Sequence, residues 1–157
     1  MNMNDTQFSL FNDCQDLKFS ISIGKKSSDS WQSYSCSLSI RNSGTGGYKT
    51  LYSSDAGSII SDISLDDIRQ LSTFCQDVIL QPSEKTRLSF VSETNDFRLD
   101  IQVNDDVFRV TAVIDLCTMS EEKLDAGQGD SEISLTFNCT IDEIKEFGTE
   151  IDNWLAK

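Results

Sequence analysis

Apolar and polar residues alternate along much of the first half of the chain, with the two-residue period of a strand that buries one face. Phe19, Ile21 and Ile23 alternate with serines, and the segment 34–40 repeats this pattern. The glycine-rich segment 42–47 predicts a turn, because glycine readily adopts the positive φ angles that turns need. We therefore expect short strands around residues 8–11, 19–23, 34–40 and 48–52.

The period changes to that of a helix after Ser64. Apolar residues then recur at helical spacing, at Leu65, Ile68, Leu71, Cys75, Val78 and Ile79. Ser64 and Asp67 have the spacing of a capping box, in which each side chain bonds the backbone N–H of the other residue. Pro82 cannot continue a helix, so the pattern predicts a helix from about residue 65 to residue 80.

Strands return after the proline, with alternating runs at 88–91, 97–103, 108–116 and 133–139. Only Asn104-Asp105-Asp106 separates the second of these runs from the third, which predicts a β-hairpin. Thr140 and Glu143 form a second capping box. Helical spacing follows it, at Ile141, Ile144, Phe147, Ile151, Trp154 and Leu155. This predicts a helix over 141–155 that packs on a sheet through its apolar side.

The order of strands, helix, strands, helix predicts an α+β fold, a mostly antiparallel β-sheet or sandwich with one central and one C-terminal helix. Alternating strands leave one sheet face in solvent, which argues against a doubly wound parallel sheet. A chain of 157 residues suits one core, so we expect residues 1–157 to form a single domain. The sequence shows neither a domain linker nor an internal repeat.

The charge is strongly negative and unevenly distributed. The chain has 26 acidic and 13 basic residues, for a net charge of −13. Residues 1–80 carry six Lys/Arg against nine Asp/Glu, whereas residues 81–157 carry seven against seventeen. Such a field repels nucleic acid and anionic membranes and attracts a basic protein. The charge therefore predicts an acidic binding protein with a basic protein partner, and it leaves the oligomeric state open.

Most catalytic chemistry is excluded by composition. The chain has no histidine, which removes Ser–His and Cys–His nucleophile pairs and histidine-ligated zinc. The cysteines are scattered without a CxxC motif, at positions Cys14, Cys36, Cys75, Cys117 and Cys139. They read as mostly buried, reduced thiols, and the sequence has no signal peptide or membrane-spanning stretch. We therefore expect a cytoplasmic protein that is not an enzyme and has no cofactor and no metal.

Two other chemistries match parts of the residue pattern. The segment 125–130 has the acidic oxygens and glycines of a calcium loop, but it lacks the alternating ligands and terminal Glu of an EF-hand. An exposed loop explains it better. Paired carboxylates could serve a glycoside hydrolase, yet 26 acidic residues supply such pairs by chance.

The candidate binding site lies in the most acidic part of the chain. Between Asn104 and Asp152 there are thirteen acidic residues against three basic ones. The hairpin turn, the polar loop 119–130 and the outer face of the last helix share this charge. The candidate partner-binding residues are Asp105, Asp106, Glu121, Glu122, Asp125 and Asp130. The alternative is a solvated surface that serves only solubility.

Three features together resemble a known family. They are a strand beginning Trp31-Gln-Ser-Tyr34, a helix beginning Ser64-Leu-Asp-Asp-Ile68, and, after a hairpin, a strand Ile133-Ser-Leu-Thr-Phe137 leading into a helix that ends Trp154-Leu155. In this order of elements the chain resembles the WapI-type immunity proteins, which neutralise a toxin of a contact-dependent or polymorphic bacterial toxin system. The resemblance implies a toxin domain as partner, no catalysis and no cofactor, and it identifies no binding residue.

Three alternative classes stay open beside this one. Type III secretion chaperones are also small, acidic and mixed α/β, but they usually begin with a helix, whereas this chain begins with strands. A carboxylate-based hydrolase and a ligand-binding β-sandwich are the other two. The neighbouring reading frame discriminates between the first two classes, because an immunity gene lies beside a toxin and a chaperone gene beside a secreted effector.

Overall fold

The computed structural model describes residues 6–26, 28, 30–54, 61–80, 86–94, 96–115 and 132–157. They form two antiparallel sheets and two helices, so the predicted α+β fold is confirmed. The first sheet contains β1 (Thr6–Phe11), β2 (Leu17–Ile23), β3 (Trp31–Arg41), β4 (Tyr48–Ser53) and β5 (Ser61–Ser64). The second contains β6 (Thr86–Val91), β7 (Phe97–Asn104), β8 (Val107–Asp115) and β9 (Glu132–Cys139). The helices are α1 (Leu65–Ile79) and α3 (Ile141–Leu155).

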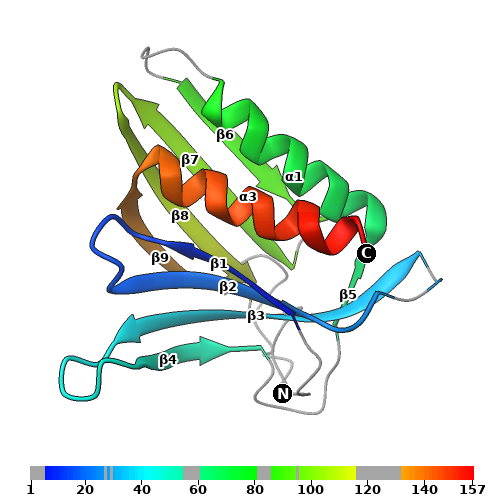
Figure 1. Cartoon of the computed structure of the whole chain (residues 1–157), viewed down its shortest axis with the longest axis horizontal. Helices are drawn as coiled ribbons and strands as arrows, with labels where there is room; N and C mark the ends of the chain where they lie inside the picture. Colours follow the sequence, from blue (N-terminus) through cyan, green and yellow to red (C-terminus); the bar gives the residue numbers. More distant parts are fainter. Residues whose placement is uncertain are drawn as a thin grey trace.

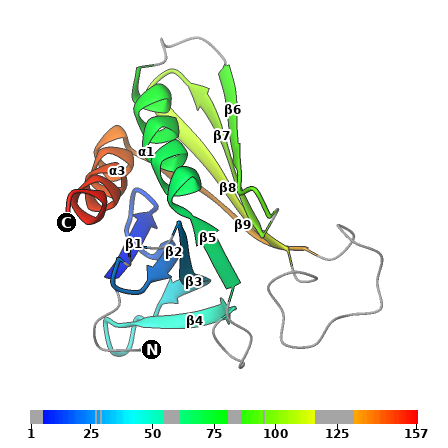
Figure 2. The ribbon, with the colours of Figure 1, turned by 90° about the vertical axis from the view of Figure 1, so that its right-hand side faces the viewer.

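The two sheets stand at an angle to each other, and the helices fill the space between them (Figure 2). In the first sheet the order is β1-β2-β3, and both β4 and β5 pair with β3. In the second sheet the strands follow chain order. Helices α1 and α3 lie side by side, α1 also contacts β6 of the second sheet, and α3 runs along β1 of the first (Figure 1).

Aromatic side chains join the two sheets in one core. The ring of Phe97 on β7 lies 5.8 Å from that of Phe19 on β2 and 6.0 Å from that of Tyr34 on β3. At the other side of the core, Trp154 of α3 meets Phe8 of β1 edge-on, with ring centroids 6.3 Å apart. Trp154 and Phe147 are buried, as predicted for the apolar stripe of the last helix. An isolated helix of this length is marginal in water, so this packing holds it in place.

Both helices begin where the sequence predicts, but the capping boxes are only half formed. The Oγ of Ser64 accepts from the N–H of Asp67 at 3.0 Å, and Thr140 Oγ1 accepts from Glu143 at 3.3 Å. The return bonds to the caps are replaced by bonds to other segments. Asp67 accepts from the N–H of Glu93 at 2.8 Å, and Glu143 accepts from Gln15 at 3.1 Å. Each carboxylate therefore bonds a turn that is distant in sequence, instead of the backbone N–H of its own N-cap residue.

One strand was not predicted. The segment β5 has only four residues, three of them polar, and pairs with the first half of β3. So short a run carries no clear period, and its partner strand alone makes it a strand. The other predicted strands are present. The predicted polar loop 119–130 and Pro82 lie outside the described residues.

The expectation that the chain has no internal repeat is wrong. The segment 6–23 aligns without a gap with 86–103, and 64–80 aligns with 140–156. Against β3, the strands β4 and β5 together take the place that β9 takes against β8. The chain therefore contains a first unit, β1 to α1, and a second unit, β6 to α3, with the same order of elements. Matching positions hold similar rather than identical residues, which hides the repeat from a search for identity.

The repeat extends to hydrogen bonds in the turns 12–16 and 92–96. In each turn the first side chain accepts from the backbone N–H groups four and five residues later. These bonds measure 2.8 and 3.1 Å at Asn12, and 3.0 and 3.4 Å at Ser92. In both turns the same residue's N–H also bonds the carbonyl five residues later.

The two units interlock. Asp67 at the start of α1 bonds the turn 92–96 of the second unit, and Glu143 at the start of α3 bonds the turn 12–16 of the first. A third link is buried, because the hydroxyl of Tyr34 donates to Asp96 at 2.8 Å. Burial raises the pKa of Tyr34, which keeps this hydroxyl protonated as the donor.

Candidate functional site

The structure places two of the six predicted site residues. Asp105 and Asp106 form the turn between β7 and β8, and both are exposed. Asp105 has a φ of 56°, in the left-handed region that aspartate adopts more readily than most residues. Glu121, Glu122, Asp125 and Asp130 lie outside the described residues, and so does the candidate calcium loop 125–130.

The register of the second sheet brings this turn to the start of α3. Phe108 of β8 pairs with Cys139 of β9. One step further along the same ladder sets Val107 across from Thr140, the residue before the helix. The turn therefore lies beside the first helical turn, which carries Asp142 and Glu143.

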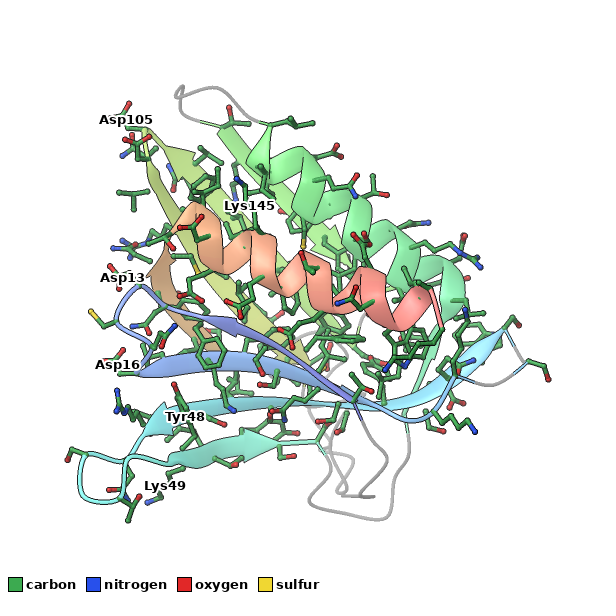
Figure 3. The ribbon with its side chains drawn as sticks, viewed as in Figure 1. Asp13, Asp16, Tyr48, Lys49, Asp105 and Lys145 are labelled. Carbon is green, nitrogen blue, oxygen red and sulfur yellow. The ribbon has the colours of Figure 1, made fainter. Side chains whose placement is uncertain are left out.

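A third segment reaches the same end of the molecule. The N–H of Asp13 donates to the carbonyl of Asn138 at 2.9 Å, and Gln15 donates to Glu143 at 3.1 Å. Asp13 and Asp16, both exposed, are thereby held near the end of β9 and the start of α3. Figure 3 shows Asp13, Asp16 and Asp105 along one side of the molecule. We call this surface the acidic end, formed by Asp13, Asp16, Asp105, Asp106, Asp142 and Glu143.

Two apolar side chains lie within the acidic end. Val107 is 46% exposed and Ile141 is 36% exposed. An apolar centre with a polar rim is the usual anatomy of a protein–protein interface. Basic residues also lie at this end: Arg109 on β8, Lys145 on α3, Lys18 on β2, and Arg41, whose N–H donates to the carbonyl of Asp16 at 2.7 Å. The six carboxylates outnumber these four basic side chains.

The carboxylates act on a neighbouring thiol. Asp13, and more weakly Asp16, raises the pKa of the exposed Cys14 in the turn between them. A thiol held protonated is a poor nucleophile, so this cysteine reports a negative field rather than a reactive site. Ion pairs do not neutralise the acidic end within the described part of the chain. The ion pairs there join Arg87 and Arg98 to Asp100, and Arg98 to Glu132, on the outer face of the second sheet.

Lysines gather at the other end of α3. A pocket of about 380 Å³ is lined by Thr6, Lys25, Lys26, Trp154 and Lys157. Lys26 donates to the carbonyl of Leu155 at 2.7 Å, which satisfies a carbonyl at the end of the helix. Acids at the start of a helix and bases at its end suit the helix dipole, which accounts for Asp142 and Lys26. It does not account for the four aspartates on the two turns.

Two findings on the described residues concern metal ligands and thiols. These residues contain no group of three or more His, Cys, Asp or Glu side chains that could hold a metal ion. Burial raises the pKa of the Cys36, Cys75 and Cys139 thiols, that of Cys75 to about 12. These cysteines are free and buried. No helix in the described ranges is long and apolar enough to cross a membrane.

Sequence reasoning missed Asp13, Asp16, Val107 and Ile141. The two aspartates lie in the half of the chain that is nearly neutral, far from the acidic stretch in sequence. Their place follows from the repeat, because the turn 12–16 meets α3 as the turn 92–96 meets α1. An alignment of the two halves was the signal that could have shown it.

No protein-family model and no curated protein matches this chain. The resemblance to WapI-type immunity proteins therefore stays a prediction, and the function must be argued from the surface itself.

Proposed function

We propose that this protein is a non-enzymatic binding protein that docks its acidic end onto a basic protein and covers the partner's working surface. The observation that carries the proposal is the convergence of six carboxylates from three segments around Val107 and Ile141. Because the three segments are far apart in sequence, the fold itself assembles the charge.

The resemblance in the sequence suggests the class of partner. We propose an immunity protein whose partner is a toxin domain with a basic cleft. A cleft that holds an anionic substrate needs positive charge, and an acidic inhibitor exploits the same field. A cytoplasmic location belongs to this proposal, and the free described cysteines suit a reducing compartment.

Charge and apolar contact should have separate roles in binding. Exposed carboxylates steer the encounter and mainly raise the association rate. Val107 and Ile141 would lose water on binding and mainly slow dissociation, as the centre of an interface does. This separation gives the proposal two independent tests.

The experiment takes as partner a basic toxin domain, from the neighbouring reading frame where that frame encodes one, and measures binding kinetics at low and high ionic strength. In one variant Asp105, Asp106 and Asp142 become Ser. We expect slower association and a flatter salt dependence, with dissociation almost unchanged. In a second variant Val107 and Ile141 become Ser, and we expect faster dissociation with the salt dependence retained.

The matched control lies at the start of α1. Asp62→Ser with Asp66→Ser removes two exposed carboxylates near the start of α1, against three in the first variant, and we expect wild-type kinetics. Asp66 holds the place in the first unit that Asp142 holds in the second. If this control slows association as much as the first variant does, only net charge matters and the acidic end is not a site. Full protection of cells by both site variants during co-expression would contradict the proposal as well.

A further inference from the structure

The outer edge of β6 lacks a bond to a helix that the corresponding strand β1 has. In the first unit, the N–H of Ser9 on the edge strand β1 points away from β2 and donates to Glu150 of α3 at 3.3 Å. In the second unit, Ser89 holds the corresponding place on β6. The α1 residue that corresponds to Glu150 is Phe74, which has no acceptor. The edge of β1 is therefore closed by a helix, and the edge of β6 is not.

The turn bond fixes which groups of β6 point outward. The N–H of Ser92 bonds the carbonyl of Phe97, so Ser92 and every second residue before it face β7. Arg87, Ser89 and Val91 then direct their N–H and C=O groups away from the sheet. Within the described part of the chain, no group bonds these six outward atoms. Val91 is 45% exposed, and the side chain of Arg87 is 71% exposed.

Two other sheet edges, those of β4 and β9, are blunted at one position or more. A bulge between Leu38 and Ser39 interrupts the pairing of β4, which also carries Lys49 on its exposed side. The carbonyl of Asn138 on β9 is covered by the N–H of Asp13. Bulges, lysines and covering segments are the devices by which proteins prevent strands from adding to an edge. In the described ranges β6 has six residues in regular register, with no bulge, no lysine and no covering segment. Its one charged side chain is that of Arg87.

We propose that β6 pairs with β6 of a second copy of this chain, which joins two second sheets into one continuous antiparallel sheet. Only one register pairs all three outward residues of each copy, and it sets Ser89 opposite Ser89 of the second copy. Arg87 then lies opposite Val91 of the second copy, so no like charges face each other directly. Two positions beyond Val91 of the second copy lies Glu93, in the turn that follows β6. Its charge would attract the long side chain of Arg87, which within one copy lies 3.6 Å from Asp100.

This arrangement is self-complementary. The two-fold axis repeats the Arg87–Glu93 pair and the packing of the Arg87 stem on Val91, as an isologous interface requires. The outward N–H and C=O groups of both copies gain partners at once. The proposal is independent of the acidic end, which lies at the β7–β8 turn and the start of α3 rather than along β6.

The test is the mass of the full chain in solution, measured by sedimentation or light scattering over a concentration series. We expect twice the chain mass of 17.6 kDa at high concentration. Val91→Pro removes an outward N–H at an edge, where proline is tolerated, and should weaken association by about tenfold or more. The matched control is Ser134→Pro at an exposed position of β9, the other edge of the same sheet, and it should stay dimeric.

A charge exchange tests the register. Arg87→Glu should weaken association, and Arg87→Glu combined with Glu93→Arg should restore it. Arg109→Glu, an exposed arginine on the same sheet but away from the edge, should have no effect. A wild type that stays monomeric overturns the proposal, and so does a dimer that survives both Val91→Pro and Arg87→Glu. If the double variant folds but stays as weak as Arg87→Glu alone, the proposed register is wrong.

Discussion

On the outer face of the first sheet, Ser20 stands where Asp100 stands on the second. Ser20 is fully buried and shares a hydrogen bond of 3.0 Å with Ser9 on the neighbouring strand. Asp100 accepts a bond of 2.5 Å from Ser89, which occupies the place of Ser9. The two pairs occupy the same cross-strand positions, but the pair on the second sheet contains a carboxylate.

The comparison separates the positions that the fold requires in both units from those that vary between them. The positions that face the core hold apolar residues in both units, as Ile21 and Ile101 do. The first side chain of each hairpin turn satisfies backbone N–H groups in both units. The outer faces and edges differ, and the surface proposed to pair with a second copy lies along one of these edges, that of β6. Packing and backbone bonding therefore define the unit, and the differences between copies are free to serve binding.

The largest expected effect tests whether the two helices are equally necessary. Phe147 of α3 is buried, and Leu71 holds the corresponding place on α1. We expect Phe147→Ala to lower the free energy of unfolding by about 3–5 kcal/mol and Leu71→Ala by about 2–5 kcal/mol. Urea denaturation measures both, and Thr149→Ala on the exposed side of α3 should stay within about 0.5 kcal/mol of wild type. A loss of unfolding free energy below about 1 kcal/mol at either core position would show that α1 and α3 do not contribute equally to the core.

A smaller effect tests the interlock at the helix starts. Asp67 is buried and holds a backbone N–H, so Asp67→Ala strands that donor and should cost about 1–3 kcal/mol. Glu143 holds the exposed side chain of Gln15, which water can satisfy, so Glu143→Ala should cost under about 0.5 kcal/mol. Thermal unfolding of the two variants measures the contrast. Equal losses would show that burial of the link does not matter.

The smallest effect concerns the charged outer face and depends on pH. Burial by itself raises the pKa of Asp100, but bonds from Ser89 and Arg98 and the charges of Arg98 and Arg87 outweigh it and lower the pKa. A carboxyl whose pKa is lowered in the folded state stabilises the fold above its unfolded pKa of about 4, and this contribution is lost as the pH falls through the folded value.

The variant that checks this is Asp100→Asn. It should cost under about 1 kcal/mol at neutral pH, because the ion pairs are partly exposed, and the cost should vanish in acid. Denaturant titrations at neutral and acidic pH measure the difference. Ser20→Ala in the first unit serves as the uncharged comparison, and its effect should not change with pH. A pH-independent cost for Asp100→Asn would show that its charge is not what stabilises.

The helices and most strands could be predicted because their signals are local. Ser64 and Thr140 mark the helix starts, and the change from a two-residue to a helical apolar period distinguishes the helices from the strands. The weakest strand prediction, around Phe8, also holds, since β1 spans Thr6–Phe11. By contrast, β5 is a strand only because β3 pairs with it, and no local pattern carries that information.

The candidate site could be predicted only in part, for a related reason. Asp105 and Asp106 were found because a short polar turn between two alternating runs is a local signal. Asp13 and Asp16 reach the same surface through bonds to Asn138 and Glu143. Contacts between residues so far apart in sequence depend on how the two units pack together. The distribution of charge along the chain carries no information about that packing.

The interlock also bears on how the chain reaches this fold. The bond from Ser9 to Glu150 spans 141 positions, and that from Trp154 to Gly24 spans 130. During synthesis β1 is made well before α3, the helix that closes its edge. Contacts between residues so distant in sequence slow folding, because a long loop must close before they form. Until α3 docks, Phe8 and the edge of β1 stay uncovered, so this stage is the one most open to misassembly.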